Sequence, residues 1–199
     1  MASKPLPTIT LEQYIQYDDE AEGRGERRSE FLNGHMVEVE AATENHSSIV
    51  INLAGEARSA LKPSSCRVYS QDLRVYMPLA NESAYPDVVI VCGKGEFVPG
   101  SVLLNPLVIV EVLSPSTEQY NRGTKFARYR SISSLREYIL VAQDEMKIEQ
   151  WCLIGDGAPI TFVGKWMLNA TYAAATDVLA FTSLSLEIPL SEIYRNVVW

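Results

Sequence analysis

The sequence predicts a single α/β domain over residues 1–199, and three observations lead to this fold class. The chain of 199 residues is long enough for one domain with a full hydrophobic core and short for two. Its contents of 47% hydrophobic and 21% charged residues are ordinary for a globular protein. Strand-like runs alternate with segments of helical periodicity, and neither an internal repeat nor a linker divides them.

The first elements are expected to be a short helix, a loop and a β-hairpin. In "TLEQYIQY", Thr10 stands three residues before Gln13, a capping-box pattern typical of a helix start. The polar segment 18–28 contains two glycines and predicts a loop. Asn33-Gly34 then separates two apolar-bearing runs, which is a strong signal for a hairpin. Its two strands would span roughly residues 28–32 and 35–40.

A longer helix and a series of strands follow. Apolar residues recur at helical spacing between 45 and 61, which predicts a helix with Asn45 as its N-cap. Next come three strand-like runs, "CRVYS", "DLRVYMP" and "PDVVIV". A connection with glycine and proline leads to "PLVIVEVL", whose nearly continuous apolar residues are typical of a strand buried on both faces.

The last third of the chain is expected to start with a loop that leads into a helix. This helix, within "STEQYNRGTKFARYRSIS", has Phe126, Tyr129 and Ile132 on one side. Two strands, "EYILVAQ" and "KIEQWCL", follow, and Asp144-Glu145 suits the tight turn between them. Shorter strand-like pieces, "ITFVGKW" and "LEIPL", precede a closing amphipathic turn, "SEIYRNV".

Cysteine, histidine and apolar content exclude several classes of protein. No apolar run approaches the ~18 residues that a membrane helix needs, and the N-terminal segment lacks the apolar core of a signal peptide. We therefore expect a cytoplasmic protein without a membrane partner. Cys66, Cys92 and Cys152 are far apart and predict buried, inert thiols rather than disulfides or zinc ligands. Only His35 and His46 are present, which excludes a zinc site built on several histidines.

Two carboxylates beside buried strands are the first candidates for chemistry. Glu111 lies within the apolar run 108–113, and burying a lone carboxylate costs several kcal/mol unless a partner compensates. If Val89 opposes Ile109 in an antiparallel pair, Asp87 opposes Glu111, with Cβ atoms about 5 Å apart. A divalent cation would draw both carboxylates together. The alternative is that each carboxylate lies at a strand end and reaches water.

Lys125 is the third candidate, fourteen residues after Glu111. If the run 137–143 joins the same sheet in parallel, the connection is a right-handed crossover, which brings the helix start near the end of Glu111's strand. A lysine there would orient an attacking water or stabilise charge on a phosphate. The alternative is a solvated helix face.

A cationic strip in the same helix suggests phosphate contacts. The strip consists of Arg122, Lys125, Arg128 and Arg130. Alternatively, these cations balance the nearby Glu118 and Glu137. The net charge of -8 disfavours indiscriminate binding to nucleic acid, although a local strip with a bound metal would override it.

Other polar residues are weaker candidates. Glu30 and Gln71 would add metal ligands or hold a water, and a structural use stays open for each. His46, at the start of a helix, is either a general base or a cap or surface group. Ser114 and Ser116 lack the nucleophile-elbow pattern and a nearby His-Asp pair, which argues against a serine hydrolase.

The ordered set "YPDVVIV", "NPLVIVEVLSPST", "RGTKFARYR" and "LREYILV" resembles the bacterial Uma-two-type endonuclease family, in the PD-(D/E)xK nuclease superfamily. The resemblance covers about Leu11 to Ile193. It implies a restriction-endonuclease-like α/β fold, with a mixed central β-sheet flanked by helices and an N-terminal β-hairpin. It also implies Asp87 and Glu111 as metal ligands, with the carbonyl of Val112 completing the shell. Homodimers are common in this superfamily.

The chain departs from the family pattern in two places. Leu113 stands where the simple motif holds lysine, so the resemblance implies that the lysine role has moved to Lys125. Asn121 stands where relatives often carry aspartate. Glu30 and Gln71 match positions that are often polar in the superfamily's sites.

The sequence thus leads to two functional hypotheses of different class. The first is an endonuclease dependent on Mg²⁺ or Mn²⁺ that hydrolyses DNA and forms a homodimer, with Arg122, Arg128 and Arg130 as nucleic-acid contacts. The second is a non-catalytic dimeric binding or scaffolding domain that keeps the nuclease fold. The acidic composition and the displaced lysine favour the second hypothesis.

Overall fold

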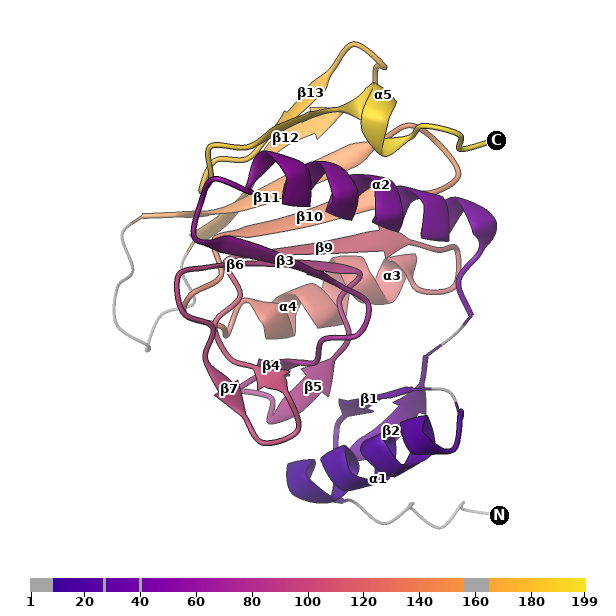
Figure 1. Cartoon of the computed structure of the whole chain (residues 1–199), viewed down its shortest axis with the longest axis vertical. Helices are drawn as coiled ribbons and strands as arrows, with labels where there is room; N and C mark the ends of the chain where they lie inside the picture. The colour runs from indigo at the N-terminus through magenta and orange to yellow at the C-terminus, as the bar shows by residue number, and fades with distance from the viewer. Residues whose placement is uncertain (1–8, 27, 40, 156–164) are drawn as a thin grey trace.

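Two six-stranded sheets form the body of the protein (Figure 1), as seen in a computed structural model that describes residues 9–26, 28–39, 41–155 and 165–199. The strands of the first sheet are β1 (Ser29–Leu32), β2 (His35–Glu38), β4 (Val75–Met77), β5 (Glu82–Ala84), β7 (Phe97–Val98) and β8 (Val102–Leu103), in the order β2-β1-β5-β4-β8-β7. Those of the second are β3 (Cys66–Ser70), β6 (Val88–Cys92), β9 (Val108–Leu113), β10 (Glu137–Ala142), β11 (Ile148–Ile154) and β12 (Lys165–Tyr172), in the order β12-β11-β10-β9-β6-β3.

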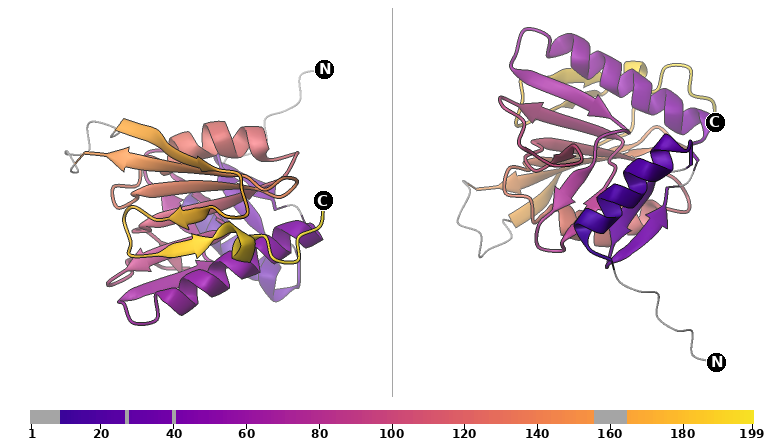
Figure 2. Two further views of the ribbon diagram at one scale, coloured as in Figure 1. Left: turned by 90° about the horizontal axis from the view of Figure 1, so that it is seen from above. Right: turned by 60° about the horizontal axis from the view of Figure 1, so that its bottom comes forward.

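Helices cover both faces of the second sheet (Figure 2). One face carries α2 (Glu44–Ala60), the hairpin of β13 (Val178–Ala180) with β14 (Glu187–Pro189), and α5 (Leu190–Ile193). The other carries α3 (Glu118–Tyr120), the π-helix η1 (Asn121–Lys125) and α4 (Phe126–Tyr129). A hydrophobic core lies on each face, and the core beneath α4 also takes side chains from the first sheet. Because β9 pairs parallel with β10 and antiparallel with β6, the predicted mixed sheet is confirmed.

The N-terminal elements match the predictions with one exception. Helix α1 (Leu11–Gly23) begins at the expected capping box of Thr10 and Gln13. The Asn33-Gly34 hairpin also forms, with φ angles of 52° and 76° that suit its primed turn. The loop expected from residue 18 was wrong, since α1 continues to Gly23. The reason is tertiary: the fully buried carboxylate of Asp18 is paired with Arg74, the residue just before β4.

The start of α2 differs from the prediction. Thr43, not Asn45, is the N-cap, and its hydroxyl accepts a hydrogen bond from the main-chain N–H of His46. The amide of Asn45 instead donates to the carbonyl oxygens of Gln143 and Val198. Asn45 therefore ties α2 to distant parts of the chain, which local capping statistics do not capture.

The connection between β9 and β10 is helical and returns to a parallel strand, as predicted. These strands are parallel neighbours, and the chain between them runs through α3, η1 and α4. Phe126, Tyr129 and Ile132 are buried against the sheet, as their spacing predicts. The end of β9 that carries Glu111 therefore lies near the start of this helical segment.

The C-terminal predictions are confirmed in part. β14 forms within "LEIPL", and α5 begins at Leu190, one residue before the predicted "SEIYRNV". A turn joins β10 to β11 at Asp144-Glu145. Most of the strand expected at 160–166 lies outside the described residues. The strand β12 runs over Lys165–Tyr172, beyond the predicted segment. No helix in the described ranges is long and apolar enough to cross a membrane.

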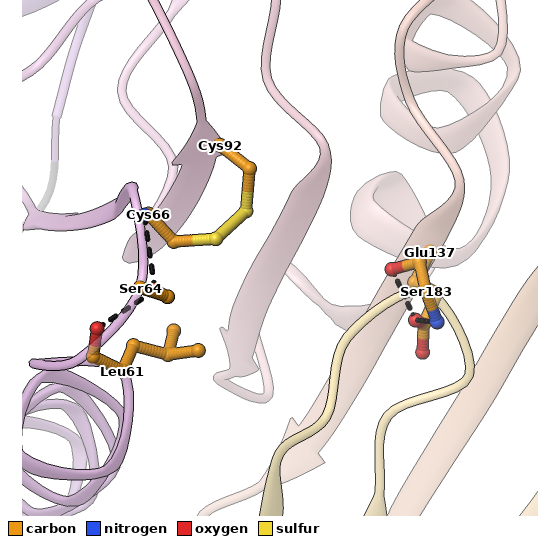
Figure 3. The surroundings of a disulfide bond; sticks show 6 residues. All are labelled: Leu61, Ser64, Cys66, Cys92, Glu137 and Ser183. Carbon is orange, nitrogen blue, oxygen red and sulfur yellow. Dashed lines mark hydrogen bonds between the residues drawn. A yellow bond between two sulfur atoms is a disulfide. The ribbon is translucent and has the colours of Figure 1, made fainter.

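A disulfide joins Cys66 and Cys92, so the prediction of free thiols was wrong for this pair (Figure 3). The two cysteines are 26 residues apart in sequence but directly opposite each other where β3 pairs with β6. Ser64 accepts from the main chain of Cys66 and donates to Leu61, which ties the bridge to the end of α2. Cys152 is a buried free thiol, as predicted. The cytoplasmic location stays a prediction, and the bridge counts against it because disulfides are uncommon in reducing compartments.

Reduction of this disulfide is expected to lower the free energy of unfolding by roughly 2–4 kcal/mol, because the bridge limits the conformations of the unfolded chain. Urea unfolding with and without a dithiol reductant measures the loss. The double variant Cys66→Ser/Cys92→Ser should match the reduced protein and be insensitive to reductant. Equal stability of the oxidised and reduced proteins would contradict the role of the bridge.

Candidate active site

Asp87 and Glu111 lie on the same face of the second sheet. Val89 pairs with Ile109, the register assumed from the sequence, and both side chains belong to the core beneath α4. Continuing this register by two residues sets Asp87 opposite Glu111. The Asp87 carboxylate accepts a hydrogen bond from the main-chain N–H of Val112, with 2.7 Å between N and Oδ2. The two acids therefore converge beside the end of β9.

Lys125 provides the positive charge beside Glu111. Its Nζ lies 2.9 Å from Oε1 of Glu111 and 3.0 Å from Oε1 of Glu30. Only 5% of Lys125 is exposed, so the alternative of a solvated helix face was wrong. The π-helical stretch η1 ends at Lys125 and presents this side chain toward the sheet. Such stretches are frequent at functional sites.

Glu30 and Tyr129 complete the contacts of this ion pair. Glu30, on β1, joins the first sheet to the site, and its Oε1 also accepts from the main-chain N–H of Tyr85 at 3.2 Å. The hydroxyl of Tyr129 donates to Oε1 of Glu111 at 2.9 Å. Burial raises the pKa of Tyr129 well above its ordinary value, so the hydroxyl stays protonated and remains a donor. Sequence reasoning assigned Tyr129 to the core and did not identify this contact.

Burial is the largest single influence on the pKa of both Glu111 and Lys125. It raises the pKa of Glu111 to about 7; the charge of Lys125 opposes this shift, and the carboxylates of Asp87 and Glu30 add to it. Burial lowers the pKa of Lys125, but Glu111 and Glu30 outweigh it and raise that pKa overall. The raised pKa of Glu111 favours its neutral form, whereas the raised pKa of Lys125 favours its charged form. Because the ammonium group has two carboxylate partners, we take Lys125 as charged, and burial favours the protonated form of Glu111.

His46 is a neighbour of the site that the sequence did not tie to it. Its Nε2 lies 3.2 Å from Oδ1 of Asp87, and its side chain is 13% exposed. Burial lowers the pKa of His46, but the hydrogen bond and charge of Asp87 outweigh this effect and raise the pKa overall. The alternative of a surface group was therefore wrong. The sequence carries little information about this contact, since a histidine in the first turn of a helix does not indicate which strand its side chain contacts.

Gln71 reaches the site through its main chain. Its N–H donates to the carbonyl oxygen of Asp87 at 3.1 Å, and its own carbonyl accepts from Arg28 at 2.7 Å. Gln71 has a φ of 55°, which marks the tight bend after β3. Among the described residues, no hydrogen bond joins the Gln71 side chain to Asp87 or Glu111.

The first arginine of the cationic strip is engaged with acids of the protein itself. Arg122 forms ion pairs with Glu118 and Glu149, at 2.7 and 2.6 Å. The alternative of charge balance is thus confirmed for Glu118. Glu137, the other acid expected to balance the strip, instead accepts hydrogen bonds from Ser183 (Figure 3).

The other two arginines have different surroundings. Arg128 forms an ion pair of 2.9 Å with the buried Glu82 of the first sheet. Arg130 places its guanidinium group 5.1 Å from the centre of the Phe126 ring. Within the part of the chain that the structure describes, no ion pair joins Arg130 to a carboxylate.

The donor set suits a hard cation with few protein ligands. Both hydrogen-bonding partners of Glu111 among the described residues contact Oε1, and neither of them occupies Oε2. Within those ranges, no group of three or more His, Cys, Asp or Glu residues could hold a metal ion by itself. Mg²⁺ is commonly bound through one or two carboxylates with waters in the remaining positions. The carboxylates of Asp87 and Glu111 fit that pattern.

Comparisons with known proteins agree with the fold. The family model described as "Uma2: Putative restriction endonuclease" matches residues 11–173. This chain belongs to the Uma2 family. Two curated Synechocystis relatives are 28% identical to it. "Uncharacterized protein slr1290" matches over 195 residues, 98% of this chain and 96% of its own length, and "Uncharacterized protein sll1609" over 150 residues, 74% and 82%.

A solved structure has the same fold as this Uma2 protein. It is the crystal structure of "a putative nuclease belonging to DUF820 from Anabaena variabilis ATCC 29413". The TM-score is 0.65 at 14% identity, and the match covers 86% of this chain and 92% of that one. At this identity the likeness establishes the fold alone. Membership of the Uma2 family confirms the resemblance found in the sequence and supports a nuclease-like function.

The stability of the metal-free Uma2 protein should depend on the titration of Glu111. Because its pKa lies above the ordinary 4.5, the folded state binds more protons than the unfolded state between pH 4.5 and about 7. The stabilisation is full below this window and is lost as the pH rises through about 7. Relative to Glu111→Gln, the wild-type free energy of unfolding should fall by roughly 1–3 kcal/mol across the window. Urea unfolding in EDTA at several pH values tests this, and parallel pH profiles for the two proteins would contradict it.

Proposed function

We propose that this protein is a metal-dependent endonuclease that hydrolyses phosphodiester bonds in DNA. The observation that carries the proposal is the convergence of Asp87, Glu111 and Lys125 on one face of the sheet. Lys125 is within 2.9 Å of Glu111, and Asp87 lies opposite that acid in the extended strand register. Membership of a family described as a restriction endonuclease agrees with this chemistry.

Asp87 and Glu111 would hold Mg²⁺ or Mn²⁺, with the carbonyl oxygen of Val112 as a third ligand. The N–H and C=O groups of one strand residue point toward the same neighbouring strand. Since the N–H of Val112 donates to Asp87, its carbonyl is expected to face the same side. A cation in this position polarises a phosphate oxygen and lowers the pKa of a bound water.

Lys125, Glu30 and Tyr129 would balance the charge of the site and orient its carboxylate and ammonium groups. Three carboxylates, from Glu30, Asp87 and Glu111, face the single ammonium group of Lys125 and the imidazole of His46. With Glu111 also ionised, as it is above a pH of about 7, and His46 neutral, this leaves two negative charges, which a divalent cation would neutralise. Lys125 would stabilise the charge that develops on the phosphate, and Glu30 holds its ammonium group in place. Tyr129 fixes the orientation of Glu111.

Arg122, Arg128 and Arg130 are proposed as the contacts to the phosphates of DNA. Arg122 and Arg128 have carboxylate partners in the structure, so they would exchange these partners for phosphate oxygens. Arg130 lies over the ring of Phe126 and has no carboxylate partner among the described residues, so it would not have to give up an ion pair to bind a phosphate. We therefore expect Arg130→Ala to weaken DNA binding the most of the three single substitutions.

Cleavage assays with the full chain test the proposal. Supercoiled plasmid, linear duplex and single-stranded oligonucleotides of DNA and RNA are incubated with EDTA, Mg²⁺ or Mn²⁺. We expect cleavage of DNA with Mn²⁺ or Mg²⁺ and none in EDTA. If no nucleic acid is cut with any divalent ion, the catalytic proposal fails.

The alternative to an endonuclease is a non-catalytic dimeric binding or scaffolding domain. The ion pairs of Arg122 and Arg128 favour it, because these groups already have partners. The two functions differ in their response to metal. An endonuclease site predicts that Mn²⁺ at a hundredfold excess over the dissociation constant stabilises the protein by about 2.7 kcal/mol, whereas a scaffold predicts no change.

Two further proposals concern the number of domains in the chain and its oligomeric state. We propose that residues 1–199 form one domain, which is supported by the core shared between the two sheets. We also propose a homodimer, as in relatives of this superfamily. Sedimentation of the full chain at several concentrations tests the second proposal, and limited proteolysis tests the first.

A further inference from the structure

His46 approaches the site from a helix whose other buried residues belong to a different core. The buried face of α2, including Ile49, Val50 and Leu53, packs in the core on the opposite side of the sheet. The imidazole of His46, in the first turn, nevertheless reaches Oδ1 of Asp87. Its backbone is fixed there, because its N–H donates to the N-cap hydroxyl of Thr43 at 3.1 Å.

The two contacts of Asp87 come from different elements and fix its carboxylate. Oδ2 accepts from the main chain of Val112 on β9, and Oδ1 meets His46 on α2. Two contacts on two oxygens determine the plane of the carboxylate, which a single contact would leave free to rotate. An ionised carboxylate has about four acceptor positions, so lone pairs remain on both oxygens for a cation.

The contacts of the imidazole point to a role centred on Asp87. Nδ1 of His46 is buried and has no hydrogen-bond partner among the described residues, so the ring has a single polar contact. Leaving a buried ring nitrogen unpaired is costly, and an apolar side chain would fill the same space without this cost. A histidine here is therefore explained by its contact with Asp87 and not by the packing of α2.

We propose that His46 is a positioning residue, which holds the carboxylate of Asp87 in the orientation that accepts a divalent cation opposite Glu111. This inference rests on the proposed function, because it assumes that Asp87 binds the metal. Hydrogen-bonding partners of metal ligands typically change metal affinity by about 10–100-fold when they are removed. His46 would act through Asp87 and would not touch the substrate.

The test is the dissociation constant of Mn²⁺, measured by titration calorimetry on the full chain without DNA. We expect His46→Ala to weaken binding by about 10–100-fold. His46→Gln carries an Nε2 donor at a similar distance from the backbone, so it should restore most of the wild-type affinity. Asn45→Ala is the matched control: it disturbs the same helical turn through contacts with Gln143 and Val198 and should bind Mn²⁺ like the wild type.

A measurement on the metal-free wild type covers the case in which His46→Ala does not fold. In the ¹⁵N spectrum of the imidazole, the proton should reside on Nε2 and its signal should shift in Asp87→Asn. A neutral ring with its proton on Nδ1 would overturn the inference.

The titration outcomes separate this inference from the proposed function. If the wild type and His46→Ala bind Mn²⁺ equally, the positioning role fails and the endonuclease proposal survives. If His46→Gln binds as weakly as His46→Ala, the hydrogen bond to Asp87 is not the cause of the loss, and the inference also fails. If the wild type does not bind Mn²⁺ at all, both proposals fall together.

Discussion

Asp87→Asn is expected to abolish Mn²⁺-dependent cleavage, with a loss of at least about 100-fold in rate. The substitution keeps the shape of the side chain and its capacity to accept from Val112, so the fold should persist. It removes the negative charge that, together with Glu111, would bind the cation. Initial rates of plasmid nicking at saturating Mn²⁺ measure the effect, and calorimetry on the same protein measures the lost metal binding.

Asp72→Asn is the matched control for this substitution. Asp72 lies just before β4, is largely exposed and forms an ion pair with Arg28 outside the proposed machinery. Its loss should leave cleavage within about twofold of the wild type, because an exposed ion pair contributes little. Undiminished cleavage by Asp87→Asn would remove the basis of the proposed active site.

Lys125→Met is expected to lower the free energy of unfolding of the metal-free protein by about 3–5 kcal/mol. Methionine fills a similar volume but carries no charge. It would leave Glu111 and Glu30 without the cation that lies between them at 2.9 and 3.0 Å. Urea unfolding in EDTA at about pH 8, above the pKa of Glu111, measures the loss. Cleavage should disappear as well.

Two variants sharpen the interpretation of Lys125→Met. Lys147→Met removes a partly exposed lysine that contacts Glu145 and Glu149, at 3.5 and 4.0 Å, and should change stability by less than about 1 kcal/mol. Adding Glu30→Gln to Lys125→Met should recover part of the lost stability, because one uncompensated carboxylate is then removed. Wild-type stability of Lys125→Met would show that the buried acids do not depend on this lysine.

The arrangement of the site was largely predictable where local patterns carry long-range information. The apolar runs around Val89 and Ile109 bury both faces of neighbouring strands, and aligning them sets Asp87 opposite Glu111. The handedness of a parallel crossover then places Lys125 beside the end of β9. Both steps rest on general rules of strand pairing, which is why they hold without knowledge of the remaining contacts.

The contacts that the sequence did not reveal all join segments far apart in the chain. Cys66 and Cys92 meet because β3 and β6 pair, and no spacing rule identifies such partners. His46 contacts Asp87 because the first turn of α2 lies beside the residue that precedes β6. Asp18 looked like a loop residue, since its polar neighbours do not show that Arg74 compensates its burial.

The sequence by itself determined the class of fold, the hairpin, the crossover helix and the pair of acidic residues in adjacent strands. These follow from apolar periodicity and turn chemistry, which act over a few residues. Only the tertiary structure decided which charges compensate one another: Lys125 between Glu30 and Glu111, Arg122 and Arg128 with their own acids, and His46 on Asp87. The physical reason is that an ion pair depends on distances of a few ångströms between side chains, and such distances are set by packing of the whole chain.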